Sequence, residues 1–244
     1  MTVLEGYDPR ILPNLRDTGG LPVDGGRTRT RPGVLYRSAL PKAGDRAPQG
    51  LPAWPAGTVV DLRSAVECVE AEHPLASHGA TVHRLPLMAD EDITGAGHIT
   101  QYRDGLAGLY RSMVTDAGAR FADVLRAAAD GDGPVLVHCA AGKDRTGVSV
   151  AMLLSLAGVD RTAVVADYVR TEADLPAVME RLRGHGPAYA VPEGLEEFMG
   201  SPAHAIEAVL DLWDAHPGGV RGWIGAQGAD EAVIERWITR VRES

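Results

Sequence analysis

The feature that most constrains the fold of this chain is one continuous unit at residues 135–158. It opens with the apolar run Val135-Leu136-Val137, passes through HCAAGKDRTG at positions 138–147 and continues as VSVAMLLSLAG. A continuous apolar run is typical of a central strand that is covered on both faces. The second apolar stretch predicts a buried helix that stops at Gly158, because glycine readily adopts the left-handed conformation that ends helices. The unit therefore predicts a strand, a tight loop and a helix of an α/β protein.

The rest of the chain shows different patterns before and after Gly158. Before it, short β-type runs at 34–36, 58–62 and 81–87 precede a long segment of helical spacing, which is broken near Gly118. A Pro-rich surface loop is expected over residues 40–57. After Gly158 the chain has helical patterns only, and these lie at 161–170, 174–183, 202–215 and 229–242.

These patterns predict an α/β protein with a central, mostly parallel sheet flanked by helices. We expect a single domain over residues 1–244. Residues 1–158 would form its α/β body, with the loop at 138–146, and residues 159–244 would form a helical cap. The cap is not expected to fold alone, since each of its helices carries too little apolar surface.

Charge and cysteine content exclude several classes of protein. The formal net charge of −9 argues against nucleic acid as a partner, because a phosphate backbone is bound by clustered Lys and Arg. Two cysteines cannot build a disulfide framework, and neither belongs to a CxxC pair. The histidines show no HxH or HxxxH grouping. We therefore expect neither a metal ion nor another cofactor.

The N-terminal sequence and the cysteine content favour a location in the cytoplasm. The N-terminal residues lack a basic segment followed by an apolar one, and no run approaches the roughly 18 apolar residues of a membrane span. Two cysteines without a disulfide framework suit a reducing compartment. Secretion without a leader and the oligomeric state stay open.

The loop after the predicted central strand has the chemistry of a phosphoryl-transfer site. Unpaired N–H groups of such a loop and of the following helix start converge on one point and bind anions. They also stabilise a thiolate, so Cys139 is expected to be nucleophilic. Arg145 offers a two-pronged donor to phosphoryl oxygens. Gly142 lets the loop approach the ligand and accommodates a positive φ, and the Thr146 hydroxyl can donate to the departing sulfur.

The order His-Cys-x5-Arg-Thr resembles the signature loop of the cysteine-dependent protein tyrosine phosphatase superfamily, and HCAAGKDRTG resembles its bacterial atypical branch. Further segments agree with that branch. They are Asn14–Gly20 (NLRDTGG), Arg31–Ser38 (RPGVLYRS), Asp61–Glu67 (DLRSAVE) and the stretch from Gly219 to Ile224 before a final helix. The resemblance touches most of the chain, but only the loop is highly specific.

The resemblance implies a phosphotyrosine phosphatase-like fold and a phosphatase that works through a cysteinyl-phosphate intermediate. Cys139 would be the nucleophile and Arg145 the phosphoryl-binding residue, His138 would tune the cysteine, and the C-terminal helices would form a lid. The residues that complete the phosphate-binding loop would be Ala140, Ala141, Gly142, Lys143 and Thr146. Phosphotyrosine proteins are the expected substrates, with phosphoserine, phosphothreonine and phosphoinositides in addition.

The general acid stays open at this stage. A phenolic leaving group with a pKa of about 10 benefits from a proton donor. Asp144 is one candidate, although it could simply cap the helix. Asp90 and Asp92, after the third predicted strand, are the alternatives.

Polar residues elsewhere have structural explanations beside functional ones. Asp61 and Arg63 lie at the C-terminal end of a predicted strand, where ligands of α/β proteins tend to lie. Ser64 and Glu67 have the spacing of a capping box, which explains both. Arg16, Asp17 and Arg37 are expected to form internal ion pairs. Cys68 is expected to be an inert buried thiol rather than a disulfide partner of Cys139.

Two other functions compete with a phosphatase. One is a phospho-ligand binding module without catalysis, and the other is a cysteine-based reductase, for which Cys68 is the only candidate resolving cysteine. Among phosphatases, Lys143 suits polyanionic phosphoinositides. Ala140, however, occupies the position of a lysine in tensin-type lipid phosphatases, which argues for weaker recognition of an inositol ring.

Overall fold

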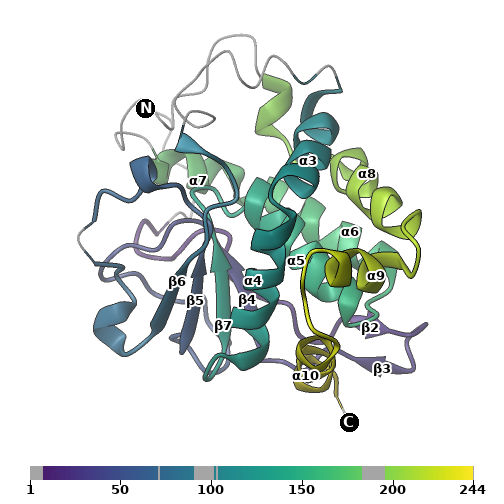
Figure 1. Ribbon diagram of the computed structural model, residues 1–244. Coiled ribbons are helices and arrows are strands. Elements are labelled where there is room, and N and C mark those ends of the chain that lie inside the picture. The colour runs from purple at the N-terminus through teal and green to yellow at the C-terminus, as the bar shows by residue number, and fades with distance from the viewer. Residues whose placement is uncertain (1–7, 71, 91–101, 103, 183–195, 244) are drawn as a thin grey trace.

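The computed structural model describes residues 8–70, 72–90, 102, 104–182 and 196–243 (Figure 1). Its main sheet has five strands in the order β1-β4-β7-β5-β6. The strands are β1 (Arg16–Asp17), β4 (Leu35–Ser38), β7 (Val135–His138), β5 (Thr58–Asp61) and β6 (Thr81–Arg84). Only β1 runs antiparallel to its neighbour. The predicted mostly parallel sheet is therefore confirmed, with the 135–138 strand at its centre.

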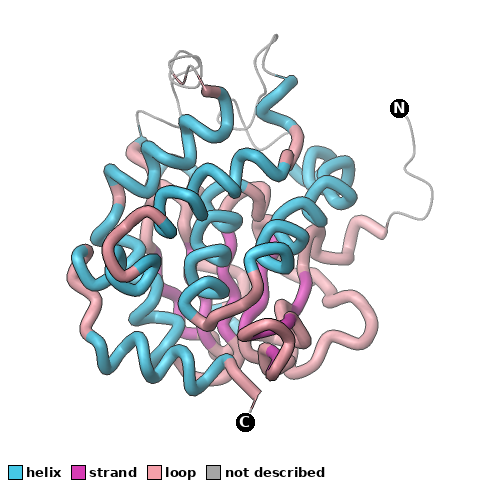
Figure 2. The backbone as a smooth tube through the Cα atoms, turned by 90° about the vertical axis from the view of Figure 1, so that its right-hand side faces the viewer, coloured by secondary structure: helices cyan, strands magenta, loops and turns pink. Residues whose placement is uncertain are grey.

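Helices gather on one side of this sheet, as Figure 2 shows from the helical side. They are α3 (Gly105–Asp116), α4 (Gly118–Asp130), α5 (Asp144–Leu156), α6 (Arg161–Val169), α8 (Ala203–Asp214), α9 (Gly219–Ala226) and α10 (Glu231–Val241). α7 (Leu175–Leu182) instead packs beside the loop that follows β7. Short 3-10 helices are η1 (Ala65–Glu67), η2 (Ala76–His78), η3 (Arg170–Asp174) and η5 (Glu196–Met199), and β2 (Pro22–Val23) pairs with β3 (Thr28–Arg29).

Each helical segment predicted from the sequence corresponds to a helix of the structure. The break near Gly118 separates α3 from α4, and a Cβ on Gly118 would lie 2.0 Å from the Gln227 side-chain oxygen. α9 was not among the predicted helical segments. Its glycines at 219, 222 and 225 weaken the apolar pattern that reveals the other helices.

Alternating side chains of the strands serve two apolar layers. Val135 and Val137 of β7 enter the large cluster beneath the helices, whereas Leu136 enters a smaller cluster on the other face. That second face is covered by irregular chain, which includes the predicted loop at 40–57. Both faces of β7 are thus buried, as its continuous apolar run predicted.

The C-terminal helices share the large cluster. Trp213 of α8 and Trp223 of α9 pack with ring centroids 5.3 Å apart, and Trp223 meets Phe121 of α4 at 5.7 Å. Trp237 of α10 donates its indole N–H to the carbonyl of Leu153 at 2.8 Å. Residues after 202 are therefore part of the core that supports the sheet.

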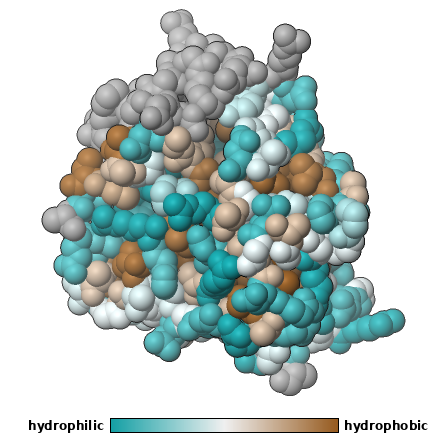
Figure 3. Space-filling model, in the orientation of Figure 1, coloured by the Kyte–Doolittle hydropathy of each residue, from teal (hydrophilic) through white to brown (hydrophobic). Residues whose placement is uncertain are grey.

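The surface mixes polar and apolar side chains. On the face shown in Figure 3, apolar residues are scattered among hydrophilic ones. Within the described ranges, no helix combines the length and the hydropathy that crossing a membrane requires.

Candidate active site

Cys139 lies where the central strand ends. It directly follows β7, and residues 140–143 separate it from the start of α5 at Asp144. Its side chain is only 2% exposed. The last residues of the neighbouring strands, Ser38 and Asp61, flank His138 in the register of the sheet. A loop at the carboxyl edge of a parallel sheet that leads into a helix is a common anion-binding position.

The carbonyl groups of this loop are held from outside. The four consecutive carbonyls of residues 139–142 accept hydrogen bonds of 2.8–3.2 Å. Their donors are the His138 ring, the Leu40 N–H and the side chains of Asn14 and Arg37. In a trans peptide the N–H points opposite to the carbonyl of the same unit. The N–H groups of residues 140–143 therefore turn away from these donors and toward the concave side of the loop.

Gly142 meets both conditions expected of it. Its φ is +69°, in the left-handed region that favours glycine. A Cβ at this position would lie 2.2 Å from the carbonyl oxygen of Ser38. The loop can thus pass directly over the end of β4 only with glycine here.

Arg145 is buried and points toward Glu67. Its two terminal nitrogens donate to the two carboxylate oxygens of Glu67 at 2.5 and 2.8 Å. Burial alone would lower the pKa of Arg145, but the hydrogen bonds and charge of Glu67 raise it above its ordinary value. Burial alone would likewise raise the pKa of Glu67, but Arg145 holds it below its ordinary value. Both groups therefore stay charged.

The role of Glu67 corrects the sequence analysis. The predicted capping interaction is present, since the Ser64 N–H donates to Glu67 at 2.9 Å, but capping does not account for the whole of its role. The same carboxylate orients the guanidinium of Arg145. The two residues are 78 positions apart, so only the fold brings them together.

The remaining loop side chains have distinct surroundings. Ala140 packs against Val178 and Leu182 of α7, so a small apolar side chain lies where tensin-type lipid phosphatases have a lysine. The Thr146 hydroxyl is fully buried and finds no hydrogen-bond partner among the described residues. It is thus free to bind a further hydrogen-bonding group.

Lys143 and Asp144 contact the helical part of the chain. The buried Lys143 ammonium donates to the carbonyls of Phe198 and Gly200 at 2.5 and 2.9 Å, and it lies 3.2 Å from Asp144. Asp144 also accepts a hydrogen bond from the hydroxyl of Tyr110 at 2.7 Å. The Asp144 side chain remains 27% exposed, so it can still meet a ligand.

The ion pairs expected near the N-terminus are present for two of three residues. Arg16 and Arg37 both pair with Asp167 of α6, at 2.8 and 2.6 Å, in a buried cluster behind the loop. Asp17 contributes differently, since it accepts the backbone N–H groups of Gly19 and Gly33. Asp167 was not identified from the sequence because nothing in its local pattern distinguishes it from a surface acid.

Asp61 and Arg63 lie beside the loop, as a pair rather than as free groups. Both are fully buried, and two nitrogens of the Arg63 guanidinium bind the Asp61 carboxylate, the shortest contact being 2.8 Å. Cys68 is half-buried, with its sulfur 3.9 Å from Asp61. Burial and the Asp61 charge raise the pKa of Cys68. Both cysteines are free thiols in the structure.

A buried cluster under the loop escaped the sequence analysis. Asp61, His73 and His138 place potential metal-ligating atoms within 4.8 Å of one another, although no HxH or HxxxH spacing announces them. Burial lowers the pKa of both imidazoles, that of His73 to about 3. The cluster is therefore made of neutral rings beside an arginine-bound carboxylate.

The two alternative candidates for the general acid, Asp90 and Asp92, have fewer described contacts near the loop. Asp90 accepts the backbone N–H of Val66 at 3.2 Å and so lies beside η1, next to Glu67. Asp92 falls outside the described residues.

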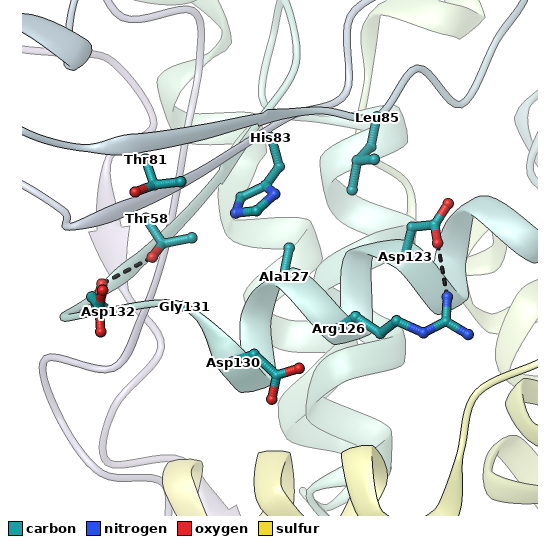
Figure 4. A pocket seen from close by; sticks show the side chains of 10 residues that line it. All are labelled: Thr58, Thr81, His83, Leu85, Asp123, Arg126, Ala127, Asp130, Gly131 and Asp132. Carbon is teal, nitrogen blue, oxygen red and sulfur yellow. Dashed lines mark hydrogen bonds and ion pairs between the residues drawn. The ribbon is translucent and has the colours of Figure 1, made fainter.

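An open cavity of about 480 Å³ lies away from the Cys139 loop (Figure 4). It is lined by the first residues of β5 and β6, Thr58 and Thr81, and by α4 with the turn that follows it. These strand ends are opposite to those that carry Asp61 and the Cys139 loop. Asp123 and Arg126 in its wall pair with each other at 2.8 Å.

Comparisons with known proteins find phosphatases among the similar chains. A model of the tyrosine phosphatase family matches residues 9–243. The triple specificity protein phosphatase PtpB of Mycobacterium tuberculosis is 28% identical over 86% of this chain and 91% of that protein. A tyrosine-protein phosphatase of Nostoc commune is 30% identical over 76% of this chain and 66% of that protein. The crystal structure of P. aeruginosa TpbA matches with 24% identity and a TM-score of 0.34, over 80% of this chain and 94% of that one.

Proposed function

The chain belongs to the tyrosine phosphatase family and is a protein-tyrosine phosphatase, and on that premise we propose that it acts through a cysteinyl-phosphate formed on Cys139. One observation carries the proposal. Arg145, whose guanidinium donates two hydrogen bonds to Glu67, follows a loop whose N–H groups turn inward beside the cysteine. That arrangement supplies a nucleophile and donors to the charge that develops on the phosphoryl oxygens.

In the first step the Cys139 thiolate attacks phosphorus and the bond from phosphorus to the leaving oxygen breaks. The inward N–H groups and Arg145 bind the three phosphoryl oxygens. Asp144 gives its proton to the leaving oxygen, so the alcohol or phenol departs neutral. Its place next to Arg145 supports this assignment over Asp90, whose carboxylate accepts the backbone N–H of Val66.

In the second step water attacks the cysteinyl-phosphate and the sulfur leaves as thiolate. Asp144, now a carboxylate, takes the proton from that water, which restores the starting state and releases phosphate. The buried Thr146 hydroxyl, which lacks a partner in the described structure, donates to the departing sulfur. This chemistry requires a reduced Cys139, which suits the cytoplasm.

Phosphotyrosine is the proposed preferred substrate. The Lys143 ammonium is occupied by two backbone carbonyls and Asp144, and Ala140 faces α7. Neither residue therefore adds free positive charge for an inositol polyphosphate headgroup. Weaker action on phosphoserine, phosphothreonine and phosphoinositides is proposed as well, and the name of one relative, a triple specificity protein phosphatase, supports a broad substrate range.

The test is hydrolysis of p-nitrophenyl phosphate from pH 5 to 8 in chelator, for the intact protein, Cys139→Ser and the matched control Cys68→Ser. We expect Cys139→Ser to lose more than about 10³-fold in kcat/KM and the control to stay within about twofold. Equal activity of Cys139→Ser and the intact protein would refute the mechanism. Loss of activity in Cys68→Ser would show that hydrolysis also needs the second thiol, which this mechanism does not predict.

A further inference from the structure

We infer that His73 is a positioning residue of the site, which fixes the tautomer and orientation of His138 and, through it, the carbonyl of Cys139. His73 follows η1 by six residues in a segment that precedes η2, and its side chain is 3% exposed. Its Nε2 lies 3.0 Å from Nε2 of His138. The inference rests on the proposed role of Cys139 as nucleophile.

Backbone groups at both ends determine where the protons lie. The N–H of Leu75 donates to Nδ1 of His73 at 3.2 Å, so that nitrogen is an acceptor and carries no proton. At the other end, Nδ1 of His138 faces the carbonyl oxygen of Cys139 at 3.1 Å, so that nitrogen must donate. In neutral rings, His73 therefore carries its proton on Nε2 and donates to the bare Nε2 of His138. The chain of donors runs in one direction, from Leu75 to Cys139.

The surroundings keep both rings neutral. The charged groups around the pair are Asp61, Arg63, Arg84 and Arg145, and Asp61 is itself bound by Arg63. A second proton on His138 would place two N–H groups against each other in the 3.0 Å gap between the Nε2 atoms, and a second proton on His73 would place its Nδ1–H against the N–H of Leu75. The arrangement therefore has one stable proton pattern.

This pattern bears on Cys139 through its own peptide unit. As long as His138 donates to the Cys139 carbonyl, the N–H of Ala140 in the same unit is turned the opposite way, toward the concave side of the loop. That N–H contributes to the field that stabilises a thiolate. Without His73, the bare Nε2 of His138 is buried and unpaired, and the opposite tautomer, which can no longer hold the Cys139 carbonyl, becomes favourable next to Asp61.

The same atoms could be read as a metal site, but the proton pattern opposes that reading. A metal ligand needs a lone pair, and Nε2 of His73 has none while Leu75 donates to Nδ1. The Asp61 carboxylate is also already bound by Arg63. Stoichiometric zinc in the purified protein, lost on replacement of His73, would overturn the positioning role.

The experiment measures the pH dependence of Cys139 alkylation by iodoacetamide in a Cys68→Ser background, so that one thiol reports. His73→Phe removes the donor, His73→Gln retains an N–H, and His78→Phe is the control on an exposed histidine of the same segment. We expect the alkylation midpoint to rise by about one pH unit in His73→Phe, with a loss of about tenfold in kcat/KM at pH 6. It should return most of the way in His73→Gln and stay unchanged in the control. An unchanged midpoint in His73→Phe, or the same rise in His73→Gln, would overturn the inference.

A second measurement does not depend on any His73 variant folding. The imidazole nitrogen chemical shifts of the intact protein should show a proton on Nδ1 of His138 and on Nε2 of His73. A proton on Nε2 of His138 would overturn the inference, even if Cys139 proved to be the nucleophile. Loss of the proposed phosphatase mechanism would be seen separately, as activity retained by Cys139→Ser.

Discussion

The two halves of the segment 139–144, which leads from β7 into the first residue of α5, are supported by different parts of the chain. The first half, residues 139–142, has its carbonyls held by donors of the α/β body and the N-terminal segment. The second half, Lys143 and Asp144, contacts residues 198–200 and Tyr110 through side chains. The difference teaches that the proposed nucleophile and phosphate site are built on buried, fixed partners, while the proposed acid depends on the helical region.

The largest effect is expected from Asp167→Asn, which breaks the support behind the first half. Arg16 and Arg37 would be left buried without their carboxylate, which costs about 3–5 kcal/mol of unfolding free energy. Urea unfolding measures this loss, with the exposed Asp211→Asn as the control. A cost below about 1 kcal/mol would show that the cluster does not support the loop.

The pH dependence of this contribution has a definite sign. Burial alone would raise the pKa of Asp167, but Arg37 and Arg16 hold it below its ordinary value. Its contribution is therefore complete above the unfolded pKa of about 4 and is lost as the pH falls through the lower folded value. The stability difference between the intact protein and Asp167→Asn should accordingly shrink below about pH 4.

Asp144→Asn probes the second half, with a loss that depends on the leaving group. We expect about 10²-fold lower kcat for phenyl phosphate, whose leaving group has a pKa of about 10, and a smaller loss for p-nitrophenyl phosphate. Stopped assays on both esters measure the ratio. Equal losses for the two esters would remove Asp144 as the acid and leave Asp90 and Asp92 as candidates.

Asn14→Gly tests whether the first half acts through its carbonyls. Asn14 has a φ of +59°, so glycine keeps the backbone conformation while it removes the amide that binds the carbonyls of residues 141 and 142. The expected result is a loss of about tenfold in kcat/KM for p-nitrophenyl phosphate, equivalent to about 1.4 kcal/mol. Unchanged kinetics would mean that the N–H groups are oriented without this donor.

The smallest effect is expected for Lys143→Met. Because its ammonium already binds two carbonyls, KM should change by only about threefold, to the same extent for a phosphotyrosine peptide and a phosphoinositide. A selective loss of more than about tenfold on the phosphoinositide would show that the lysine reaches the substrate.

The same division explains what could be predicted from the sequence. The strand, the glycine turn and the helix start are local, so the positions of Cys139, Gly142 and Arg145 followed from a short stretch. The supporting groups are distant along the chain: Glu67 is 78 residues from Arg145, and His73 is 65 residues from His138. A lone acid or histidine has no local pattern that states its partner. Only the parallel pairing of β5 with β7, which aligns Asp61 with His138, brings these segments together.

The tryptophan cluster has a consequence for how this protein can be observed. Three of the four tryptophans of the chain lie in α8, α9 and α10. The fourth, Trp54, packs against Tyr36 on the other face of the sheet. Intrinsic fluorescence therefore originates mainly from buried indoles and reports the state of the helical half, while the partly buried Trp54 reports the second apolar layer. Emission should respond strongly to denaturant and weakly to phosphate. A binding signal would need a fluorophore introduced near the loop, whereas the native emission serves as a built-in measure of whether a variant is folded.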